Sequence, residues 1–450
     1  MMVANSGIPG PLFLTKIYNK RVNLNLAAIL TICFLSIFYG VNTYFNSLIS
    51  ILWVGIFIFN IFKKEKYLIL GVLTIFQTQF EIFGFSAFKI VIILFALFEI
   101  IDFKKTRLSM TIPSIIFCGI MISFGIFIFF MQGLGLTFLI PYCCSCITIV
   151  LLINNFYNNF DLFKYFSFGF IIGFLICSLS GVFLILIGKG NLSTIVVRFK
   201  GTMPDPNHYS MHGMLALLFS FFLIKNKKIK IIACITILLF CILSASTNFF
   251  FCLSISLIGV FISTNINKSG GKEKILFRIS FALIIVLSLL LFLYLSNVLG
   301  YITYKYPNSN SGVMKLVRQF YALQTGDFET FSSYRTDIWK SYLDYFVHQN
   351  VFRMIFGGNL SSTYGVQNFI DSVISNRASH NTFIDILMCT GIVGFFVFVL
   401  SCVFSFYKAT HKSNLHNTSA LFILMKLAVL IYFFGLSCFP SWFLFLILFI

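Results

Sequence analysis

Charged residues are scarce in this chain, and acidic residues are the scarcest. Only 10% of its 450 residues are charged, with 13 Asp or Glu against 32 Lys or Arg. Because 59% of the residues are hydrophobic, a soluble core could not hide them behind a polar surface. The composition therefore excludes an ordinary water-soluble domain and indicates that a membrane is the main solvent.

The sequence also lacks the motifs that hold nucleotides, paired cysteines or structural metals. It has no G-x-x-x-x-G-K-[ST] loop, no Gly-rich dinucleotide fingerprint and no D-x-D pair. Its 12 Cys fall within apolar runs and show no paired spacing in the polar stretches, which argues against disulfides and zinc sites. We therefore expect no cofactor, no metal and, for an enzyme, no nucleotide donor.

Long apolar runs recur along nearly the whole chain. Each run has about 17 to 25 residues, the length that a helix needs to cross the hydrocarbon. We predict an all-α integral membrane protein with about 14 (12–14) transmembrane helices. The predicted spans are 24–43, 46–62, 67–84, 86–103, 112–131, 136–154, 165–188, 209–225, 229–246, 249–264, 276–297, 381–407, 419–437 and 440–450.

Positive charge alternates along the predicted connections. Lys and Arg gather in every second connection, which places these connections and the N-terminus in the cytoplasm. Because this pattern explains the net charge of +19, no nucleic-acid partner is expected. The clusters are Lys63, Lys64 and Lys66; Lys104, Lys105 and Arg107; Lys225, Lys227, Lys228 and Lys230; Lys268, Lys272, Lys274 and Arg278; and Lys408 and Lys412.

Two connections on the opposite, outer side are long, polar and basic, namely 189–208 and 298–380. They divide the chain into three predicted regions. Residues 1–297 form a multi-helix region that includes the outer loop 189–208, residues 298–380 form a large outer loop, and residues 381–450 form the last helices. Basic residues on the disfavoured side work against the insertion bias, so we look for chemistry in these loops.

The first candidate site is the stretch VVRFKGTMPDPNHYSMHG, which enters the helix that begins near Tyr209. Arg198 and Lys200 offer cationic donors, and Asn207 is predicted to be the helix N-cap. A helix N-terminus beside an Arg favours an anion, whereas the alternative is a merely solvated loop. His208 and His212 have a spacing that can bind a metal, but no third ligand is evident nearby.

The second candidate is SSYRTDIWKSYLDYFVHQN in the large outer loop. It predicts an amphipathic helix that lies on the membrane or on the helix bundle. Arg335 stands near its start, with Trp339 one turn later, and the planar fork of Arg suits a pyrophosphate. A surface stacking pair is the alternative. The apolar stripe of this helix comprises Ile338, Trp339, Tyr342, Leu343, Phe346 and Val347.

The third candidate is ASHNTFIDILMCTGIVG, which opens a predicted spanning helix. His380 and Asn381 stand at its mouth, and Asp385 follows about one turn inside. A neutral His can take a proton from a hydroxyl near physiological pH, and Asn381 can cap the helix. Ionisable groups such as Asp385 inside a membrane are functional candidates. Alternatively, His380 only covers the end of the bundle at the interface.

Taken together, RFKGTMPDPNHYS, SSYRTDIWKSYLDYF and SHNTFIDILMCTGIVG resemble the O-antigen polymerase and ligase superfamily. They stand in that family's order, and the likeness extends over about residues 165–410. One departure is clear. Many members carry an Arg at the outer end of a mid-chain span, within a stretch rich in Ser or Thr, where this chain reads LSASTNFFF with Asn248 and no Arg.

The resemblance implies a metal-independent glycosyltransferase of the bacterial inner membrane that acts at the periplasmic face. Its donor would be a glycan linked to undecaprenyl pyrophosphate. By the same resemblance, Arg198 and Arg335 bind the pyrophosphate and His380 is the base on the acceptor hydroxyl. The other residues expected to contact substrate are Lys200, Asn207, Trp339, Asn381 and Asp385. Expected partners are the lipid-linked oligosaccharide, membrane lipid and a polysaccharide chain-length regulator.

The leading interpretation is an O-antigen or surface polysaccharide polymerase, which extends a glycan on a lipid carrier. The alternative within the family is a ligase, which transfers finished polysaccharide to lipid A core. A flippase for lipid-linked oligosaccharide represents another class of protein. It would need charged groups deep in several helices and no large outer loop, so the few deep charges here favour an enzyme.

Overall fold

The computed structural model describes eleven segments of the chain, and these are mostly helical, as predicted. Among the described residues, three helices are long and apolar enough to cross a membrane: Leu136–Asn158, Phe160–Leu186 and Thr382–Thr410. The total of about 14 crossings stays a prediction. The described segments are 24–77, 79–82, 85–101, 109–132, 136–189, 198–265, 312–332, 335–358, 379–411, 416–436 and 441–450.

The N-terminal part consists of short helices and one small hairpin: α2 (Leu24–Ser36), α3 (Thr43–Phe59), α4 (Glu65–Ile75), β1 (Glu81–Ile82), β2 (Phe85–Ser86) and α5 (Ala87–Ile101). The predicted crossing 67–84 is wrong in its second half, because α4 ends at Ile75 and the antiparallel pair β1–β2 follows. Helix α4 has 11 residues and rises about 16 Å, which is roughly half of the hydrocarbon thickness. The predicted cytoplasmic tail 1–23 lies outside the described residues.

The central part contains six helices among the described residues: α6 (Ile112–Gln132), α7 (Leu136–Asn158), α8 (Phe160–Leu186), α9 (Pro206–Leu223), α10 (Lys227–Leu243) and α11 (Thr247–Asn265). Each coincides with a predicted span, since the apolar runs of the sequence set their extent. The predicted crossing 276–297 lies outside the described residues. Helix α4 packs directly on α8, where a Cβ on Gly169 would come within 1.9 Å of the Leu68 carbonyl oxygen, so only glycine allows this approach.

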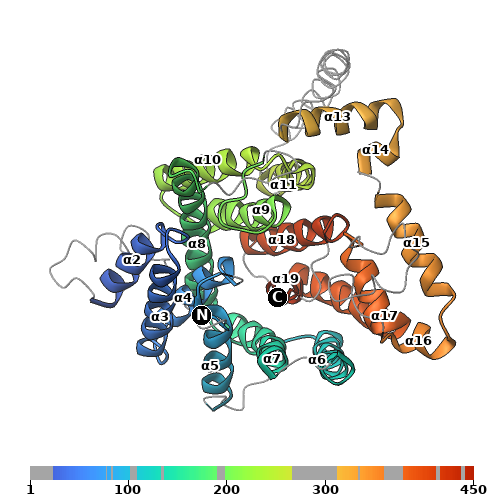
Figure 1. The fold of residues 1–450 in the computed structure, drawn as a ribbon, viewed down its shortest axis with the longest axis horizontal. Coiled ribbons are helices and arrows are strands. Elements are labelled where there is room, and N and C mark those ends of the chain that lie inside the picture. The colour runs from blue at the N-terminus through green and yellow to red at the C-terminus, as the bar shows by residue number, and fades with distance from the viewer. Residues whose placement is uncertain are drawn as a thin grey trace.

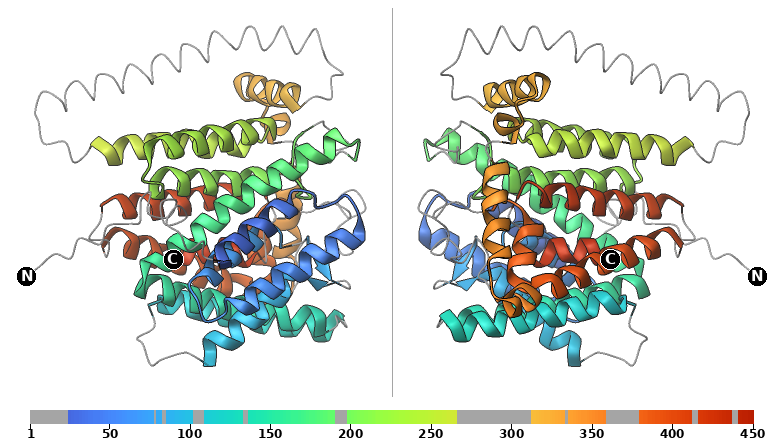
Figure 2. Two further views of the ribbon diagram at one scale, coloured as in Figure 1. Left: turned by 90° about the vertical axis from the view of Figure 1, so that its left-hand side faces the viewer. Right: turned by 90° about the vertical axis from the view of Figure 1, so that its right-hand side faces the viewer.

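In the part of residues 298–380 that the structure describes, which the sequence predicts to be an outer loop, there are four short helices: α13 (Gly312–Thr325), α14 (Phe328–Ser332), α15 (Arg335–Val347) and α16 (Val351–Phe356). They lie on the side of the bundle away from α2 and α3, where α15 and α16 stand beside α17 and α13 lies nearer α11 (Figure 1). Helix α15 runs across the direction of α17 and α18 (Figure 2). It thus crosses the helices of the bundle instead of extending them.

The predicted amphipathic helix is confirmed as α15, and its buried face docks on the bundle. Ile338, Tyr342 and Phe346 form a small apolar cluster with Ile384 and Met388 of α17. The rest of the predicted stripe is less buried. Leu343 and Val347 are exposed because they lie on the side of α15 that turns away from α17.

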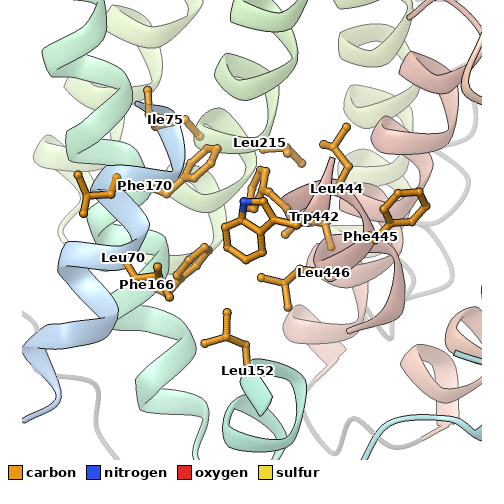
Figure 3. Packing of buried hydrophobic residues seen from close by; sticks show 14 of the residues in the cluster. Leu70, Ile75, Leu152, Phe166, Phe170, Leu215, Trp442, Leu444, Phe445 and Leu446 are labelled. Atoms are coloured by element: carbon orange, nitrogen blue, oxygen red, sulfur yellow. The ribbon is translucent and has the colours of Figure 1, made fainter. Parts of the chain in front are cut away.

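The C-terminal part contains α17 (Thr382–His411), α18 (His416–Phe433) and α19 (Trp442–Phe449). Helix α17 has a kink at Gly391, whose φ of +68° is open to glycine. The predicted crossing 440–450 is wrong, because α19 has only eight residues and rises about 12 Å. Figure 3 shows α19 inside the main apolar core, with Trp442 and Leu446 among side chains that include Phe166, Phe170 and Leu152.

Candidate functional site

The predicted site stretches meet at one end of the bundle, around a cavity of about 270 Å³. Helices α9 and α11 begin here, α18 ends here, and α13 and α15 supply the outer wall. The hydroxyl of Thr382 donates to the Leu436 carbonyl oxygen at 2.6 Å, which ties the start of α17 to the same place. The cavity is lined by Asn207, Thr247, Asn248, Phe251, Lys315, Gln319, Ser332, Arg335, Trp339, Ile431, Phe434 and Gly435.

Arg198 is the most deeply buried of the predicted cations, with 6% of its surface exposed. Its Nε donates to the Ser244 carbonyl oxygen at 2.7 Å, and its Nη2 donates to Oδ1 of Asn207 at 2.9 Å. It stands behind Asn207 instead of lining the cavity itself. Burial lowers the pKa of Arg198, as does the charge of Arg335, while Asp205 raises it. Because an Arg pKa starts so high, the guanidinium keeps its charge.

Asn207 is not the N-cap of α9, so that part of the sequence interpretation is wrong. Asp205 is the N-cap, since its Oδ1 accepts from the backbone N–H groups of Asn207 at 2.7 Å and His208 at 3.2 Å. Pro206 then occupies the first helical position, where its missing N–H removes no hydrogen bond from the helix. The Asn207 side chain is left to orient Arg198, and its Oδ1 also accepts from the Ser246 hydroxyl at 3.1 Å.

Lys200 and His212 of α9 lie at different depths in the protein. The Lys200 ammonium donates to the Pro204 carbonyl oxygen at 3.2 Å and so closes its own loop. His212 lies deeper in the bundle, where its ring stacks between Phe170 and Phe443. Within the described part of the chain, no three His, Cys, Asp or Glu side chains gather closely enough to hold a metal ion.

Two cations line the cavity without a protein partner. Within the described segments, neither the Lys315 ammonium nor the Arg335 guanidinium has a hydrogen bond or ion pair. Burial lowers the pKa of Arg335, and Asp205 raises it. Burial lowers the pKa of Lys315 to about 8, helped by the charges of Arg198 and Arg335 and opposed by Asp205. Positive charges gathered in a partly dry cavity favour an anion.

The turn before α17 is held by a compact hydrogen-bond network. Asn381 caps α17 as predicted, because its Oδ1 accepts from the N–H groups of Phe383 at 3.0 Å and Ile384 at 3.3 Å. The Ser379 hydroxyl donates to Oδ1 of Asp385 at 2.7 Å, and Asp385 is 99% buried below the turn. Asp385 and Asn381 therefore support the turn from beneath and do not line the cavity.

His380 sits on this turn in a left-handed backbone conformation, with a φ of +50°. This conformation is uncommon for a residue other than glycine, and such strain is often found at functional sites. The ring keeps part of its surface in solvent. The surrounding protein lowers the pKa of His380, and the charges of Arg335, His208 and Lys315 lower it further, while Asp205 opposes them. The neutral imidazole, which can accept a proton, is therefore favoured.

Trp339 connects the predicted motif on α15 with the predicted motif at the start of α17. Its Nε1–H donates to the Ser379 carbonyl oxygen at 2.9 Å, directly before His380. Its indole also forms part of the cavity wall, one turn after Arg335. Trp339 thus fixes the distance between α15 and the turn that carries His380.

A larger cavity lies elsewhere. It has a volume of about 680 Å³ between α6, α16 and α17, and its wall is mostly apolar, with Phe124, Phe127, Phe352 and Phe356. None of the residues predicted from the sequence lines it. The larger cavity is lined by one charged side chain, Arg353, whereas Lys315 and Arg335 both line the smaller one, so we place the chemistry at the smaller cavity.

Lys315 is the residue that the sequence interpretation missed. It lies in the stretch GVMKLVRQFYALQT, which forms α13 within a long outer connection. The available signal was a second basic amphipathic stretch in the loop that the sequence predicts to lie on the outer side. That Lys315 and Arg335 line one cavity could not be predicted from the sequence, because about 20 residues separate them and no periodic pattern connects the two positions.

Comparison with known proteins gives one match. A family model described as O-Antigen ligase matches residues 213–399, from the first turns of α9 to the middle of α17. No curated protein and no solved structure matches the chain. The matched region contains Lys315, Arg335 and His380, whereas Arg198 and Asn207 lie just before it. The match supports the O-antigen polymerase and ligase superfamily, whose members are membrane glycosyltransferase-like enzymes that act on lipid-linked glycans.

Proposed function

We propose that this protein is an O-antigen or surface polysaccharide polymerase. It transfers a glycan from a polyprenyl pyrophosphate carrier onto the terminal sugar of a second lipid-linked repeat unit. The observation that carries this proposal is that Arg335 lines the cavity, while Arg198 stands behind its wall residue Asn207 and the turn of His380 is held by its wall residue Trp339. These residues come from three segments far apart in the sequence, yet the charge of Arg335 acts on both Arg198 and His380.

The cations suit the leaving group of this reaction. The acceptor hydroxyl oxygen bonds to the anomeric carbon of the donor sugar, and the bond from that carbon to the pyrophosphate oxygen breaks. The polyprenyl pyrophosphate leaves with the bonding electrons, so negative charge grows on it. Arg335 and Arg198, already in place and partly dry, stabilise that charge more than bulk water would.

His380 is suited to activate the nucleophile by taking its proton. A sugar hydroxyl is a weak nucleophile until its proton is taken, and the lowered pKa of His380 keeps the imidazole neutral and able to accept it. The proton lost from the hydroxyl is then held by His380, which balances the charge that leaves with the pyrophosphate. Asn381, Asp385 and Trp339 hold the turn on which His380 stands.

The arrangement of Lys residues supports a periplasmic site in the inner membrane of a bacterium. Helices α9 and α10 meet at the far end from the cavity, at a connection that carries Lys225, Lys227, Lys228 and Lys230. Lys408 lies toward the same end of α17. The positive-inside rule assigns that end to the cytoplasm and the cavity to the outer face.

A ligase is the second candidate, because the matching family model is described as O-Antigen ligase. It would use the same donor and the same cations, and it would differ in the acceptor, which is lipid A core. The absence of an Arg from the LSASTNFFF stretch favours the polymerase, since the resemblance links that Arg to ligases especially.

Surface polysaccharide from a deletion strain tests the proposal. The strain is complemented with wild type, Arg335→Ala or His380→Ala, and the polysaccharide is separated on a gel at matched membrane expression. Lys340→Ala and His348→Ala serve as matched controls, because both side chains are exposed and lie outside the cavity. We expect a full ladder from wild type and both controls, and lipid A core with a single repeat from the two site variants.

The other outcomes are distinct. Bare core, together with lipid-linked polymer that accumulates in the membrane, would identify a ligase. A full ladder from Arg335→Ala and His380→Ala would overturn the assigned site. Loss of the ladder in Lys340→Ala or His348→Ala would show that the loss reflects general damage to the outer loop.

A further inference from the structure

Helix α13 brings a third cation into the cavity wall. The Thr247 hydroxyl, at the start of α11, donates to Oε1 of Gln319 at 2.5 Å and holds α13 against the bundle. Lys315 lies four residues before Gln319, so both side chains project from the same face of α13. Both line the same cavity as Arg335 of α15. A specific contact therefore keeps the Lys315 ammonium at this place.

Among the residues that the structure describes, no carboxylate forms an ion pair with Lys315. The charged groups that act on it are Arg198 before α9, Arg335 of α15 and Asp205 at the start of α9, and Lys315 in turn acts on His380. Asp205 is the one acid among them in the described part of the chain, and its Oδ1 already accepts two backbone N–H groups. Like charges held together in a partly dry cavity destabilise the empty site, and a bound anion relieves this repulsion.

Lys315 also lies where the sequence lacks a cation. In LSASTNFFF, Asn248 stands in the stretch where the resemblance leads one to expect an Arg, and its neutral amide lines the same cavity. The Lys315 side chain from α13 and the Asn248 amide from the start of α11 thus line one cavity. The cavity obtains a third positive charge from a different element.

We propose that Lys315 is a third pyrophosphate-binding residue and that, unlike Arg198 and Arg335, it carries a charge that depends on pH. This proposal rests on the proposed function, since it assumes a pyrophosphate in this cavity. An Arg keeps its proton at any physiological pH, whereas a Lys can lose its proton when it is buried near other cations. Lys315 thus makes donor binding sensitive to alkaline pH, which three Arg residues would not do.

The direction of the pH effect follows from the free protein. With a pKa of about 8, Lys315 is charged below that pH and becomes neutral above it. A bound pyrophosphate favours the charged form, so binding above pH 8 must take up a proton and becomes weaker as the pH rises. His380 is already neutral throughout this range and contributes no change there.

Binding of farnesyl pyrophosphate to the purified, detergent-solubilised protein tests the proposal, measured by calorimetry between pH 7.5 and pH 9.5. The proteins compared are wild type, Lys315→Arg, Lys315→Met, Arg335→Ala and, as the matched control, Lys340→Met. At pH 7.5 we expect Lys315→Met to bind about tenfold or more weakly than wild type, as the loss of one charge-assisted contact implies. Lys315→Arg and Lys340→Met should bind as wild type does.

The pH profile separates a binding role from a structural one. Wild-type affinity should fall as the pH rises through about 8, whereas the affinity of Lys315→Arg should stay level over the same range. Wild-type binding that is lost in Arg335→Ala but unchanged in Lys315→Met would overturn the role of Lys315 and leave the proposed function standing. No saturable binding by wild type would overturn both.

Discussion

Two basic side chains withdrawn from water in this protein have opposite surroundings. Lys426 of α18 is fully buried, and its ammonium donates to the Ser405 hydroxyl and to the Leu448 carbonyl oxygen, each at 2.7 Å. Lys315 of α13 lines a cavity and has no such partner within the described segments. The first lysine joins α17, α18 and α19, whereas the second shares its cavity with Arg335 and lies close enough to Arg198 to feel its charge.

The comparison separates structural charges from charges available to a ligand. A lysine inside the bundle is a functional candidate by default, because an ionisable group in the membrane is costly. Lys426 shows that hydroxyl and backbone oxygens can hold such a group inside the bundle. Burial alone therefore does not mark a site, and the useful criterion is whether the protein itself supplies the partners.

The largest effect is expected for Arg335→Ala at the open cavity. Loss of a preorganised cation beside the leaving group should lower the transfer rate about 100-fold or more, with little change in thermal stability, since Arg335 has no hydrogen-bond partner in the described segments to lose. The measurement is transfer from a synthetic polyprenyl pyrophosphate-linked glycan by the purified protein. A stable variant with full activity would remove Arg335 from the site.

Lys426→Ala should show the opposite pattern. The truncation leaves a cavity between α17, α18 and α19, so the free energy of unfolding should fall by about 2 to 4 kcal/mol. Thermal denaturation measures that fall, and the transfer rate per folded molecule should stay unchanged. Lys426→Met, which refills most of the volume, should lose less stability. Lost activity at unchanged stability would mean that Lys426 is a functional charge after all.

Asn207→Ala should have a smaller effect, of about tenfold on the transfer rate, because Arg198 loses the side chain that orients it. The matched control is Ser246→Ala, which removes the other partner of Asn207 and leaves the bond to Arg198 in place. A steady-state assay of kcat/KM compares the two. Equal effects in both variants would indicate that the whole turn, and not Arg198, is disturbed.

The smallest expected effect is a shift of the acid limb in the pH profile of kcat/KM. The lowered pKa of His380 keeps its imidazole neutral to a lower pH than an ordinary His with a pKa of 6.5, so activity should decline only below that value. The profile of kcat/KM measures this decline. We expect Arg335→Lys, which keeps the neighbouring charge, to preserve the position of the acid limb. An acid limb above pH 6.5 would contradict the base role of His380.

Parts of the site could be predicted from the sequence because they depend on local rules. The stripe on residues 335–347 predicted the docking helix α15, and Asn381 was correctly predicted to cap α17. The N-cap of α9 was assigned to Asn207 although Pro206 pointed to Asp205, since Pro favours the first helical position. Because of this error, the sequence analysis did not predict that Asn207 orients Arg198.

Other parts depended on contacts between distant segments and could not be predicted. The pattern of Lys315 and Gln319 on α13 says nothing about Thr247 of α11, yet the hydrogen bond between Thr247 and Gln319 holds Lys315 at the cavity. Likewise, the support of Asp385 for the His380 turn depends on Ser379, and Trp339 reaches that turn from another helix. The resemblance grouped Arg198, Arg335 and His380, but residue spacing did not.

The sequence by itself determined that this is a helical membrane protein and where most of its helices run. In hydrocarbon every backbone group must be satisfied within its own helix, so long apolar runs form helices whatever packs beside them. Only the tertiary structure decided that residues 442–449 lie inside the core and do not cross the membrane, and that Lys315 faces Arg335. Cavities and charge clusters arise from long-range packing, which no local pattern of residues encodes.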